Sequence, residues 1–280
     1  MPPCRTADKT PSLHPAPRRC AIAALALVAT QAAAQSEPVQ ITGSLGLAYR
    51  KLVEQAPSGA TLLSERGRMG LAQVQALRVQ PEGGALGLRV QVLGGDLDYD
   101  GQTQSGVPLV TTTGQSEAAA DLMWRPAAPA AWGEAWLTLG LLANRRVIHS
   151  TPIAGGLDEV SSAALVGARW RSPGFTPAAR WVAHVEAEAR VSVWHRLDVD
   201  FHGLLDKTHF EGARKRMLTL RLLAAPAQSP WEWGLEWSGL WQPASHAVGV
   251  SRGGTPLAGM TVRQPELSTR DVTLRLGRRF

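Results

Sequence analysis

The chain is poor in cysteine and tyrosine and, after residue 34, has no long apolar run. Its two cysteines, Cys4 and Cys20, both lie within the first 34 residues, so disulfides and thiolate metal sites are excluded from the rest of the chain. No later segment approaches the roughly 18 consecutive apolar residues that a membrane-spanning helix needs. Zinc-type Cys/His spacing, a P-loop and a dinucleotide-binding fingerprint are also missing. We therefore expect no metal site and no organic cofactor.

Residues 1–34 have the three parts of a secretory signal peptide. An apolar run from Cys20 to Ala29 is followed by Ala32–Ala34 and then Gln35, an order typical of exported proteins when a basic region precedes it. That basic region contains four cations, Arg5, Lys9, Arg18 and Arg19. The apolar run is too short to cross a hydrocarbon core of about 30 Å as a helix. We predict a signal peptide at 1–34, cleaved after Ala34, and a mature chain of 35–280.

Part of the net positive charge of the chain lies in this leader. Removing its four basic residues and one acidic residue lowers the formal net charge from +6 to +3. A charge this small is weak evidence for a polyanionic partner. We therefore expect no nucleic-acid partner.

Alternation of apolar and polar residues runs through the mature chain. In Ile41–Tyr49, Leu45 and Leu47 share one side with Tyr49, whereas Ser44 and Ala48 lie on the other. The same pattern recurs in 86–92 and, most clearly, in 180–194. A period of two indicates strands with two different faces. These segments are about 10–15 residues long, which exceeds the usual strand of five or six residues and suits a tilted membrane-spanning strand.

Short and long connections alternate along the chain. Four short breaks occur at Gln80–Gly84, Pro126–Gly133, Ser172–Ala179 and Ala225–Pro230. Longer polar stretches lie near 53–65, 97–116, 145–158, 197–213 and 243–268. Short periplasmic turns and long extracellular loops are typical of outer-membrane barrels. We predict an all-β fold: a closed antiparallel transmembrane β-barrel of about ten strands, or twelve if the last loop contains another strand pair.

Tryptophans cluster at three of the four short breaks. Seven of the ten lie in or within three residues of these turns: Trp124, Trp132, Trp136, Trp170, Trp181, Trp231 and Trp233. Because amphipathic indoles collect at the membrane–water interface, we expect them to form the periplasmic aromatic girdle. Tryptophans of a soluble core would not cluster in this way.

The last ten residues alternate as well, and the chain ends on Phe280. Val272, Leu274 and Leu276 share the apolar side with Phe280, while Arg278 departs from the pattern. This segment resembles the C-terminal signature strand of bacterial outer-membrane barrels. The resemblance implies a location in the outer membrane of a Gram-negative bacterium, and recognition of the terminal strand by the barrel assembly machinery. At the periplasmic rim Arg278 can extend its charge into water.

The polar faces of the strands supply the residues expected inside the barrel. Lumen-lining candidates are Arg89, Arg169, His184, Glu186, Glu188 and Arg190, together with Arg50, Asp121, Arg125, Glu159 and Arg171. Charges of both signs occur on facing strands, and barrels near this size are largely filled by side chains. We expect these groups to pair and to plug the lumen. A narrow pore is the alternative.

Two segments carry residues with acid–base chemistry. Asp98 and Asp100 would share a face of an extended strand, and so would Asp200 and His202. A carboxylate beside an imidazole can orient it as a general base for water, and adjacent carboxylates can share a proton. These motifs resemble those of the omptins, ten-stranded outer-membrane proteases with an Asp-x-Asp and an Asp-x-His on different outer loops. The resemblance implies a catalytic couple Asp98/Asp100 and a dyad Asp200/His202.

The function we favour from the sequence is non-enzymatic. Acidic residues and glycine are common in outer loops, where they solvate turns or bind divalent ions between lipopolysaccharide phosphates. A structural, surface-binding or lipid-contact role, with outer-membrane lipids and lipopolysaccharide as partners, is therefore our first interpretation. The alternatives are an omptin-like protease, a narrow pore and another rim enzyme such as a lipid A-modifying one.

Overall fold

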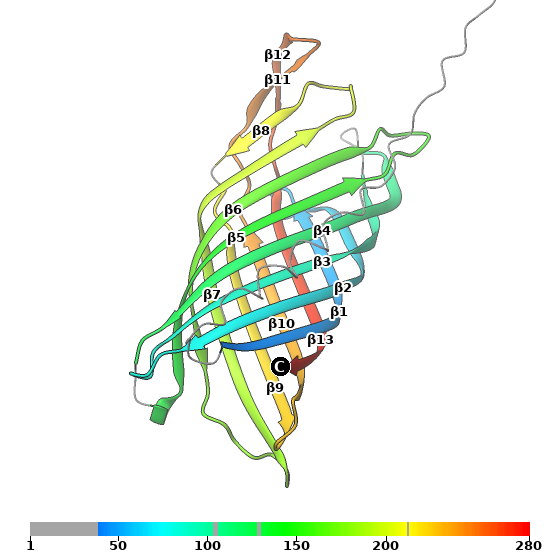
Figure 1. Cartoon of the computed structure of the whole chain (residues 1–280). Helices are drawn as coiled ribbons and strands as arrows, with labels where there is room; N and C mark the ends of the chain where they lie inside the picture. Colours follow the sequence, from blue (N-terminus) through cyan, green and yellow to red (C-terminus); the bar gives the residue numbers. More distant parts are fainter. Residues whose placement is uncertain (1–38, 103–105, 128–129, 212) are drawn as a thin grey trace, which may run out of the picture. The chain divides into compact units, whose positions relative to one another are not determined.

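The computed structural model describes residues 39–102, 106–127, 130–211 and 213–280. The predicted signal peptide and its cleavage point lie outside these residues. Ten of the described strands form the barrel wall: β1 (Val39–Gln55), β2 (Thr61–Val79), β3 (Ala85–Gln102), β4 (Pro108–Arg125), β5 (Glu134–Ile148), β6 (Leu157–Arg171), β7 (Trp181–Asp200), β9 (Arg216–Pro226), β10 (Trp231–Gln242) and β13 (Glu266–Arg279). The predicted closed antiparallel barrel is confirmed (Figure 1).

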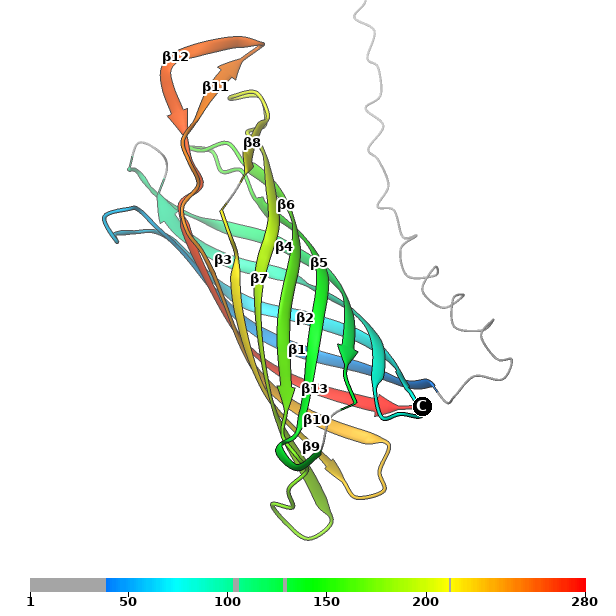
Figure 2. The same ribbon diagram turned by 90° about the vertical axis from the view of Figure 1, so that its left-hand side faces the viewer.

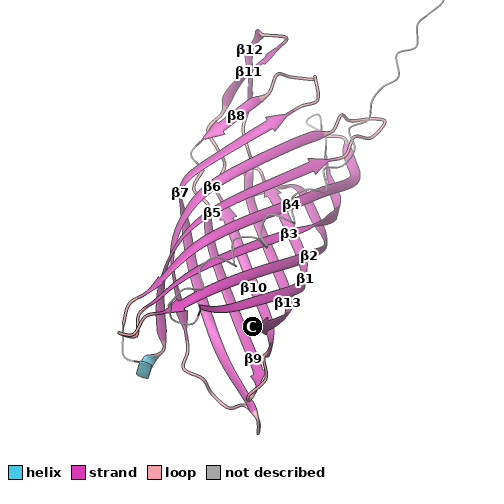
Figure 3. Cartoon of the chain, viewed as in Figure 1, coloured by secondary structure: helices cyan, strands magenta, loops and turns pink. Residues whose placement is uncertain are grey.

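The wall closes through the pairing of β1 with β13 and of β6 with β7. The first and last strands run antiparallel from Thr42↔Arg279 to Gln55↔Glu266. Closure removes the unpaired edges that an open sheet would present and satisfies backbone groups that lipid cannot. Figure 3 shows that strands make up the wall and that a short helix, η1 (Ala130–Trp132), lies in the connection between β4 and β5.

Three further strands lie beyond the wall on the extracellular side. β8 (Thr208–Glu211) pairs with the outer part of β7, whereas β11 (Val248–Arg252) and β12 (Thr255–Val262) form a separate two-stranded hairpin. Figure 2 shows this hairpin projecting past the ends of the barrel strands. The last loop therefore does contain a strand pair, as considered above, but the barrel closes with ten strands without it.

The four short connections lie at the barrel end that contains the C-terminus (Figures 1 and 2). They match the predicted breaks to within a residue or two. The strands themselves are longer than the expected 10–15 residues at several places, with 19 in β2 and 20 in β7. Stretches expected as outer loops, including Asp98 and Asp100, are therefore extensions of the wall above the membrane.

The outward face is apolar and the inward face polar, as the alternation predicts. On β1, Leu45 and Leu47 are 69% and 67% exposed, whereas Ala48 and Arg50 are buried inside. On β5, Leu137 and Leu141 also face outward. An apolar band around a polar interior is the arrangement that lipid on the outside requires. Among the described residues, no helix is long and apolar enough to cross a bilayer.

A β-bulge in β7 changes which residues face inward. Ala164 pairs with Trp194 and Leu165 with Ser192, so Val193 is an extra residue on β7. Before the bulge, Glu186 faces the interior. An inserted residue exchanges the two faces of everything that follows it. Beyond the bulge, the buried side chains are His195, Leu197 and Val199, and Asp200 is exposed.

The predicted tryptophan girdle needs one correction. Trp124, Trp231 and Trp233 are exposed near the short turns. Trp136, however, is only 5% exposed and lies inside the barrel, where the Arg125 guanidinium is 5.2 Å from its ring centroid. Its position in β5 has the parity of the luminal residues, which outweighs its closeness to a turn.

The C-terminal residues are fixed to the first strand. The Phe280 amide donates a hydrogen bond to the Ile41 carbonyl over 2.9 Å. Arg278 points outward, with its guanidinium 5.4 Å from the Trp231 ring and 5.2 Å from the Phe280 ring. Cation–π contacts therefore accommodate the one charge that breaks the terminal apolar pattern.

The outward apolar band gives a depth-dependent prediction. Leu139→Arg, in the middle of β5 and 55% exposed, should lower the free energy of unfolding by about 2–4 kcal/mol because it puts a charge into hydrocarbon. Val110→Arg, also outward but near the outer end of β4, should cost about 0–1 kcal/mol. Urea unfolding in phospholipid vesicles measures both variants. Equal costs would contradict the assigned membrane level.

Candidate functional site

The interior of the barrel is filled by ion pairs centred on arginines. In the central group, Arg89 on β3 reaches Asp121 on the neighbouring strand β4 (Nε–Oδ2 2.9 Å). The same guanidinium crosses the lumen to Glu188 on β7, at 2.8 and 3.1 Å. All three side chains are at most 4% exposed. A charge buried this deeply is tolerated only when it is paired and hydrogen-bonded.

Further cations complete the central group. Arg221 on β9 donates to Glu188 over 2.9 Å and to Glu236 on β10 over 2.6 Å, and Arg275 on β13 reaches Glu236 as well. Arg190 bonds Asp121 over 3.0 Å. The group therefore connects opposite walls of the lumen through alternating positive and negative side chains.

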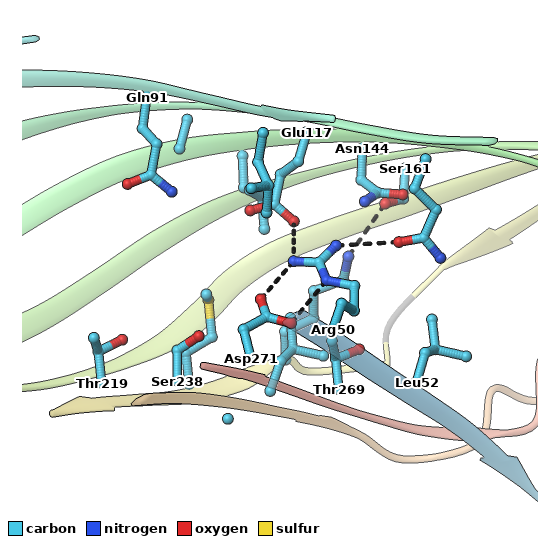
Figure 4. Close-up of a pocket in the computed structure, with 18 of the residues that line it drawn as sticks. Arg50, Leu52, Gln91, Glu117, Asn144, Ser161, Thr219, Ser238, Thr269 and Asp271 are labelled. Atoms are coloured by element: carbon cyan, nitrogen blue, oxygen red, sulfur yellow. Dashed lines mark hydrogen bonds and ion pairs between the residues drawn. The ribbon is translucent and has the colours of Figure 1, made fainter. Parts of the chain in front are cut away.

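A second group lies above the first, around Arg50 on β1. Its guanidinium forms a bidentate pair with Asp271 on β13 at 2.7 and 2.9 Å and donates to Gln115 on β4 over 3.1 Å. Glu117 lies 3.5 Å away. Figure 4 shows Arg50 between these partners in a cavity of about 100 Å³.

A third group surrounds Arg146 on β5, close to the extracellular end. Its guanidinium contacts Glu65 on β2 (2.6 and 3.0 Å), Glu54 on β1 (2.6 Å) and Glu159 on β6 (2.9 Å). Thr113 and Gln115 donate to the Glu65 carboxylate too. Sequence analysis missed Glu54, Glu65 and Arg146 because they fall in stretches expected to be outer loops. The signal that could have found them is the continued alternation around Leu52 and Glu54.

The cavities that remain are small. The cavity around Arg50 and a second one of about 110 Å³ toward the periplasmic end share Arg89 and Arg221 as lining residues. The central ion pairs therefore stand between them. Lys215 lines the cavity around Arg50, here called the upper cavity, and its ammonium lies 3.2 Å from the Ser161 hydroxyl.

The predicted lumen-lining residues lie inside the wall. Arg89, Glu188 and Arg190 belong to the central group, and Arg169 pairs closely with Glu186 nearer the periplasmic end. His184 is also near that end, half-buried, with Nδ1 3.1 Å from the Ser172 carbonyl oxygen.

The predicted acidic couple points away from the interior. Asp98 and Asp100 are exposed on β3, while Leu97 and Tyr99 between and beside them are buried inside. Both aspartates have the parity of Leu86 and Leu88, which face lipid. The sequence alternation predicts this outward direction, because β3 continues without a bulge from Leu88 to Asp98 and Asp100.

The predicted dyad has a different geometry from the one expected. The Asp200 carboxylate accepts a hydrogen bond from the backbone amide of His202 over 2.9 Å. His202 has a φ of 51° in the turn after β7, so the extended spacing that would align the two side chains ends at Asp200. Because of the bulge at Val193, Asp200 is on the outward side of the strand.

The structure does not bring the two predicted pairs together. β3 and β7 are separated by three strands, β4, β5 and β6, along the wall, or about 19 Å at the usual strand spacing. Asp98 and Asp100 face outward on one strand, and Asp200 faces outward on the other. Within the described part of the chain, no group of three or more His, Cys, Asp and Glu side chains is placed to hold a metal ion.

Asp206 fixes the extracellular hairpin to the loop after β7. Its carboxylate accepts hydrogen bonds from the Ser251 hydroxyl (2.6 Å) and from the amides of Gly253 and Gly254 (both 2.9 Å). The Ser251 hydroxyl and then these amides hold the pKa of Asp206 below its ordinary value. Arg252 adds a bond from Nε to the Leu204 carbonyl over 2.7 Å.

The central ion pairs give a stability prediction. Glu188→Ala leaves Arg89 and Arg221 without a shared carboxylate, and should lower the free energy of unfolding by about 3–5 kcal/mol. Asp158→Ala removes the partner of Arg145, whose side chain is 59% exposed, and should cost less than about 1 kcal/mol. Urea titration in lipid vesicles compares the two. A similar small effect for both would show that the central group is not a stabilising element.

The Asp206 contacts give a pH prediction. A lowered pKa in the folded state means that the contacts stabilise the hairpin above the ordinary pKa and lose this effect as pH falls through the lowered value. At pH 7, Asp206→Asn should speed amide exchange at Gly253 and Gly254 relative to wild type. Once the pH has fallen through the lowered pKa of Asp206, the two proteins should exchange alike. Asp200→Asn is the control, and hydrogen–deuterium exchange followed by mass spectrometry is the measurement; a difference that persists in acid would contradict the assignment.

Comparisons with known proteins identify the fold. No protein-family model matches the sequence, and no curated protein sequence matches it significantly. The structure is similar to the outer membrane protease OmpT from Escherichia coli, with 10% identity, a TM-score of 0.52 and coverage of 86% of this chain and 96% of that one. The translocator domain of the autotransporter NalP from Neisseria meningitidis is a weaker match, with 8% identity, a TM-score of 0.45 and coverage of 86% and 88%.

At these identities the likeness shows the fold alone. It agrees with the closed ten-stranded wall, the apolar outward face and the short turns gathered at the end that holds the C-terminus. A chain with these properties is a bacterial outer-membrane β-barrel, located in the outer membrane of a Gram-negative bacterium.

Proposed function

We propose that the protein is a sealed, non-enzymatic barrel whose outward face binds the phosphate groups of lipopolysaccharide. The observation that carries this proposal is a group of four outward cations at the upper edge of the apolar band, Lys51, Arg66, Arg68 and Arg270, named here the outer basic cluster. All four are exposed. They come from the neighbouring strands β13, β1 and β2.

The outer basic cluster places like charges directly opposite one another. Lys51 on β1 is in register with Arg270 on β13 and with Arg66 on β2. Opposed like charges on one face of a sheet are destabilising. Among the described residues, none of the four cations takes part in an ion pair within 4 Å, although Asp98 on β3 is in register with Arg66. An anionic ligand would offset the repulsion.

The level of the cluster fits a lipid headgroup. Along β1 the outward residues change from Leu45 and Leu47 to Tyr49 and then Lys51. Along β13 the outward Leu274 and Val272 give way to Arg270 at the same level. Tyrosine and tryptophan typically mark the membrane interface. Anionic lipid surfaces attract such cations with about 1 kcal/mol per residue.

The acidic residues of β3 have a role in this proposal. Asp96, Asp98 and Asp100 are exposed in one outward column beside Arg66. Carboxylate oxygens are preferred ligands of Mg²⁺ and Ca²⁺. In this arrangement each carboxylate offers a single ligand to a divalent cation whose other ligands are lipid phosphates and water, so the three aspartates need not converge with one another or with His202.

Two features support a sealed and non-enzymatic barrel over the alternatives. A narrow pore would need a polar passage past Arg89, which instead bonds across the lumen. An omptin-like protease would need Asp98 and Asp100 to face Asp200 and His202 across a groove, whereas β3 directs its two aspartates outward. For assembly, the exposed Phe280 at the end of β13 is the contact we propose for the barrel assembly machinery.

The test is the dependence of stability on lipopolysaccharide. We expect lipopolysaccharide to stabilise wild-type protein in vesicles, and Lys51→Gln/Arg66→Gln to remove about 2 kcal/mol of that gain, at about 1 kcal/mol per cation. Arg214→Gln/Arg216→Gln, which removes two exposed cations away from the cluster, is the matched control. Urea unfolding of wild type and of each variant, with and without lipopolysaccharide, gives the four free energies of unfolding that each comparison needs.

Three results would contradict the proposal. If the cluster and control variants lose the same amount of lipopolysaccharide-dependent stability, the outer basic cluster is not the binding surface. Single-channel conductance by wild-type protein in planar bilayers would contradict the sealed interior. Peptide cleavage by folded wild type that is lost in His202→Ala would make the protein a protease.

A further inference from the structure

The inner wall becomes largely apolar at the extracellular mouth, above the ion pairs of the Arg89 and Arg50 groups and beside the Arg146 group. One buried cluster contains Leu52, Leu63, Tyr99, Leu109 and Ile148; another contains Leu197, Val199 and Phe210. Below them the interior is dominated by charged groups. Apolar surface that meets water is costly. A ligand that covers the apolar side chains at this opening would therefore be stabilised there.

The β7 bulge produces part of the apolar mouth. Without the bulge, if the alternation of β7 continued unbroken past Ser192, the inward positions of its outer half would be Arg196, Asp198 and Asp200. With it, Leu197 and Val199 point inward instead, at 2% and 4% exposure. The same bulge therefore directs Asp200 outward and places the apolar side chains of Leu197 and Val199 at the mouth.

A pocket of about 300 Å³ lies between these apolar residues, and we name it the mouth pocket. Its apolar walls come from β2, β6, β7, the segment after β7, β8 and β12: Leu62, Leu63, Leu157, Leu197, Val199, Phe201, Phe210 and Val262. Figures 1 and 2 show β8 and the hairpin β11–β12 rising at this end of the barrel. Its remaining lining residues are Glu54, Gln102, Glu159, Arg263, Gln264 and Pro265.

Two carboxylates of the Arg146 group form the polar part of the mouth pocket. Glu54 and Glu159 both line the pocket and both bond the same nitrogen, Nη1 of Arg146, at 2.6 and 2.9 Å. The other two nitrogens of that guanidinium, Nε and Nη2, both donate to Glu65. Within 4 Å, the described residues give these three carboxylates no cation other than Arg146.

The mouth pocket therefore has an excess of negative charge at one end. Lys215 adds a more distant positive charge near Glu159 from the upper cavity, bonded to Ser161. The one cation among the pocket's lining residues is Arg263, which is exposed. Glu54, by contrast, is 7% exposed. An anionic end under apolar and aromatic walls complements a cation with a hydrocarbon body, and the two phenylalanines can add cation–π attraction.

We propose that the mouth pocket binds a small apolar molecule that carries one protonated amine. The hydrocarbon body packs against Leu197, Val199 and Phe210. The ammonium group donates to the carboxylates of Glu54 and Glu159, which Arg146 holds in place. This site goes beyond the lipopolysaccharide contact and uses none of the residues of the outer basic cluster.

The test compares two probes of the same size on the full protein refolded in detergent with lipopolysaccharide. They are 2-phenylethylamine and 2-phenylethanol, which differ only in the ammonium and hydroxyl groups. Because hydrogen bonds from an ionised donor are about twice as strong as neutral ones, we expect the amine to bind about tenfold more tightly, or more. Isothermal titration calorimetry measures both dissociation constants.

Variants separate the charged end from the apolar walls. Glu159→Gln removes one of the two carboxylates that accept from the ammonium, so it should weaken binding of the amine and leave binding of the alcohol unchanged. Asp158→Asn, one residue earlier on β6 and paired with exposed Arg145, removes an equal charge outside the mouth pocket and should change neither. Val199→Trp fills the pocket and should weaken both probes.

Three outcomes would overturn the proposal: no binding of either probe, equal affinities in wild type, or an amine affinity that Glu159→Gln leaves unchanged. Lipopolysaccharide-dependent stability, measured on the same samples, reports on the outer basic cluster alone. A failure at the mouth pocket is therefore distinguishable from a failure of the lipid-binding role. The same measurement shows whether each variant is folded.

Discussion

A closed wall of strands fixes the side on which every residue lies, and the rest of this structure depends on that constraint. Backbone groups must pair within the wall because lipid offers them no partner, so a strand cannot rotate to correct an unfavourable residue. The parity of each position then decides whether its side chain meets lipid or lumen. Leu45 and Arg50 are compatible with this rule, and Trp136 follows it even against its preference for an interface. One inserted residue, Val193, changes the assignment for the whole outer part of β7.

The inward parity creates the second requirement, which is to neutralise buried charge. Several arginines in the lumen bond carboxylates from strands far apart in the sequence; Arg89 and Glu188 are 99 residues apart. Such pairs do not add much stability compared with apolar packing, but each becomes costly when one partner is missing. They make the filling of the lumen specific, because each arginine bonds particular carboxylates on other strands. Because they bond from wall to wall, they also obstruct the passage that a pore would need.

Much of the fold could be predicted from the sequence because it follows from local patterns. Alternation, the short turns and the terminal Phe280 are features of neighbouring residues, and they were sufficient for the strand number and orientation. The candidate site was predicted less well. The outward direction of Asp98 was available from the parity of Leu86 and Leu88, but it was not applied beyond the expected end of the strand. The bulge at Val193 carries no local signal, since it depends on how β6 and β7 pair. Partners across the lumen, such as Arg146 and Glu65, depend on closure of the whole barrel.

The Arg146 group links the sealing of the barrel to its outer mouth. One guanidinium with three carboxylates does not give neutral packing, because the three acidic groups share a single bonded cation. The central group shares its acids among several arginines and has no such excess around Glu188. Among the three ion-pair groups the surplus is largest at the level where the inner wall turns apolar, since the Arg50 group has two carboxylates, Asp271 and Glu117, for its one arginine. If the proposed amine ligand binds there, its ammonium group supplies the counter-ion that this excess of negative charge lacks. In that proposal the outer mouth binds a cation without any rearrangement of the ion pairs deeper in the lumen.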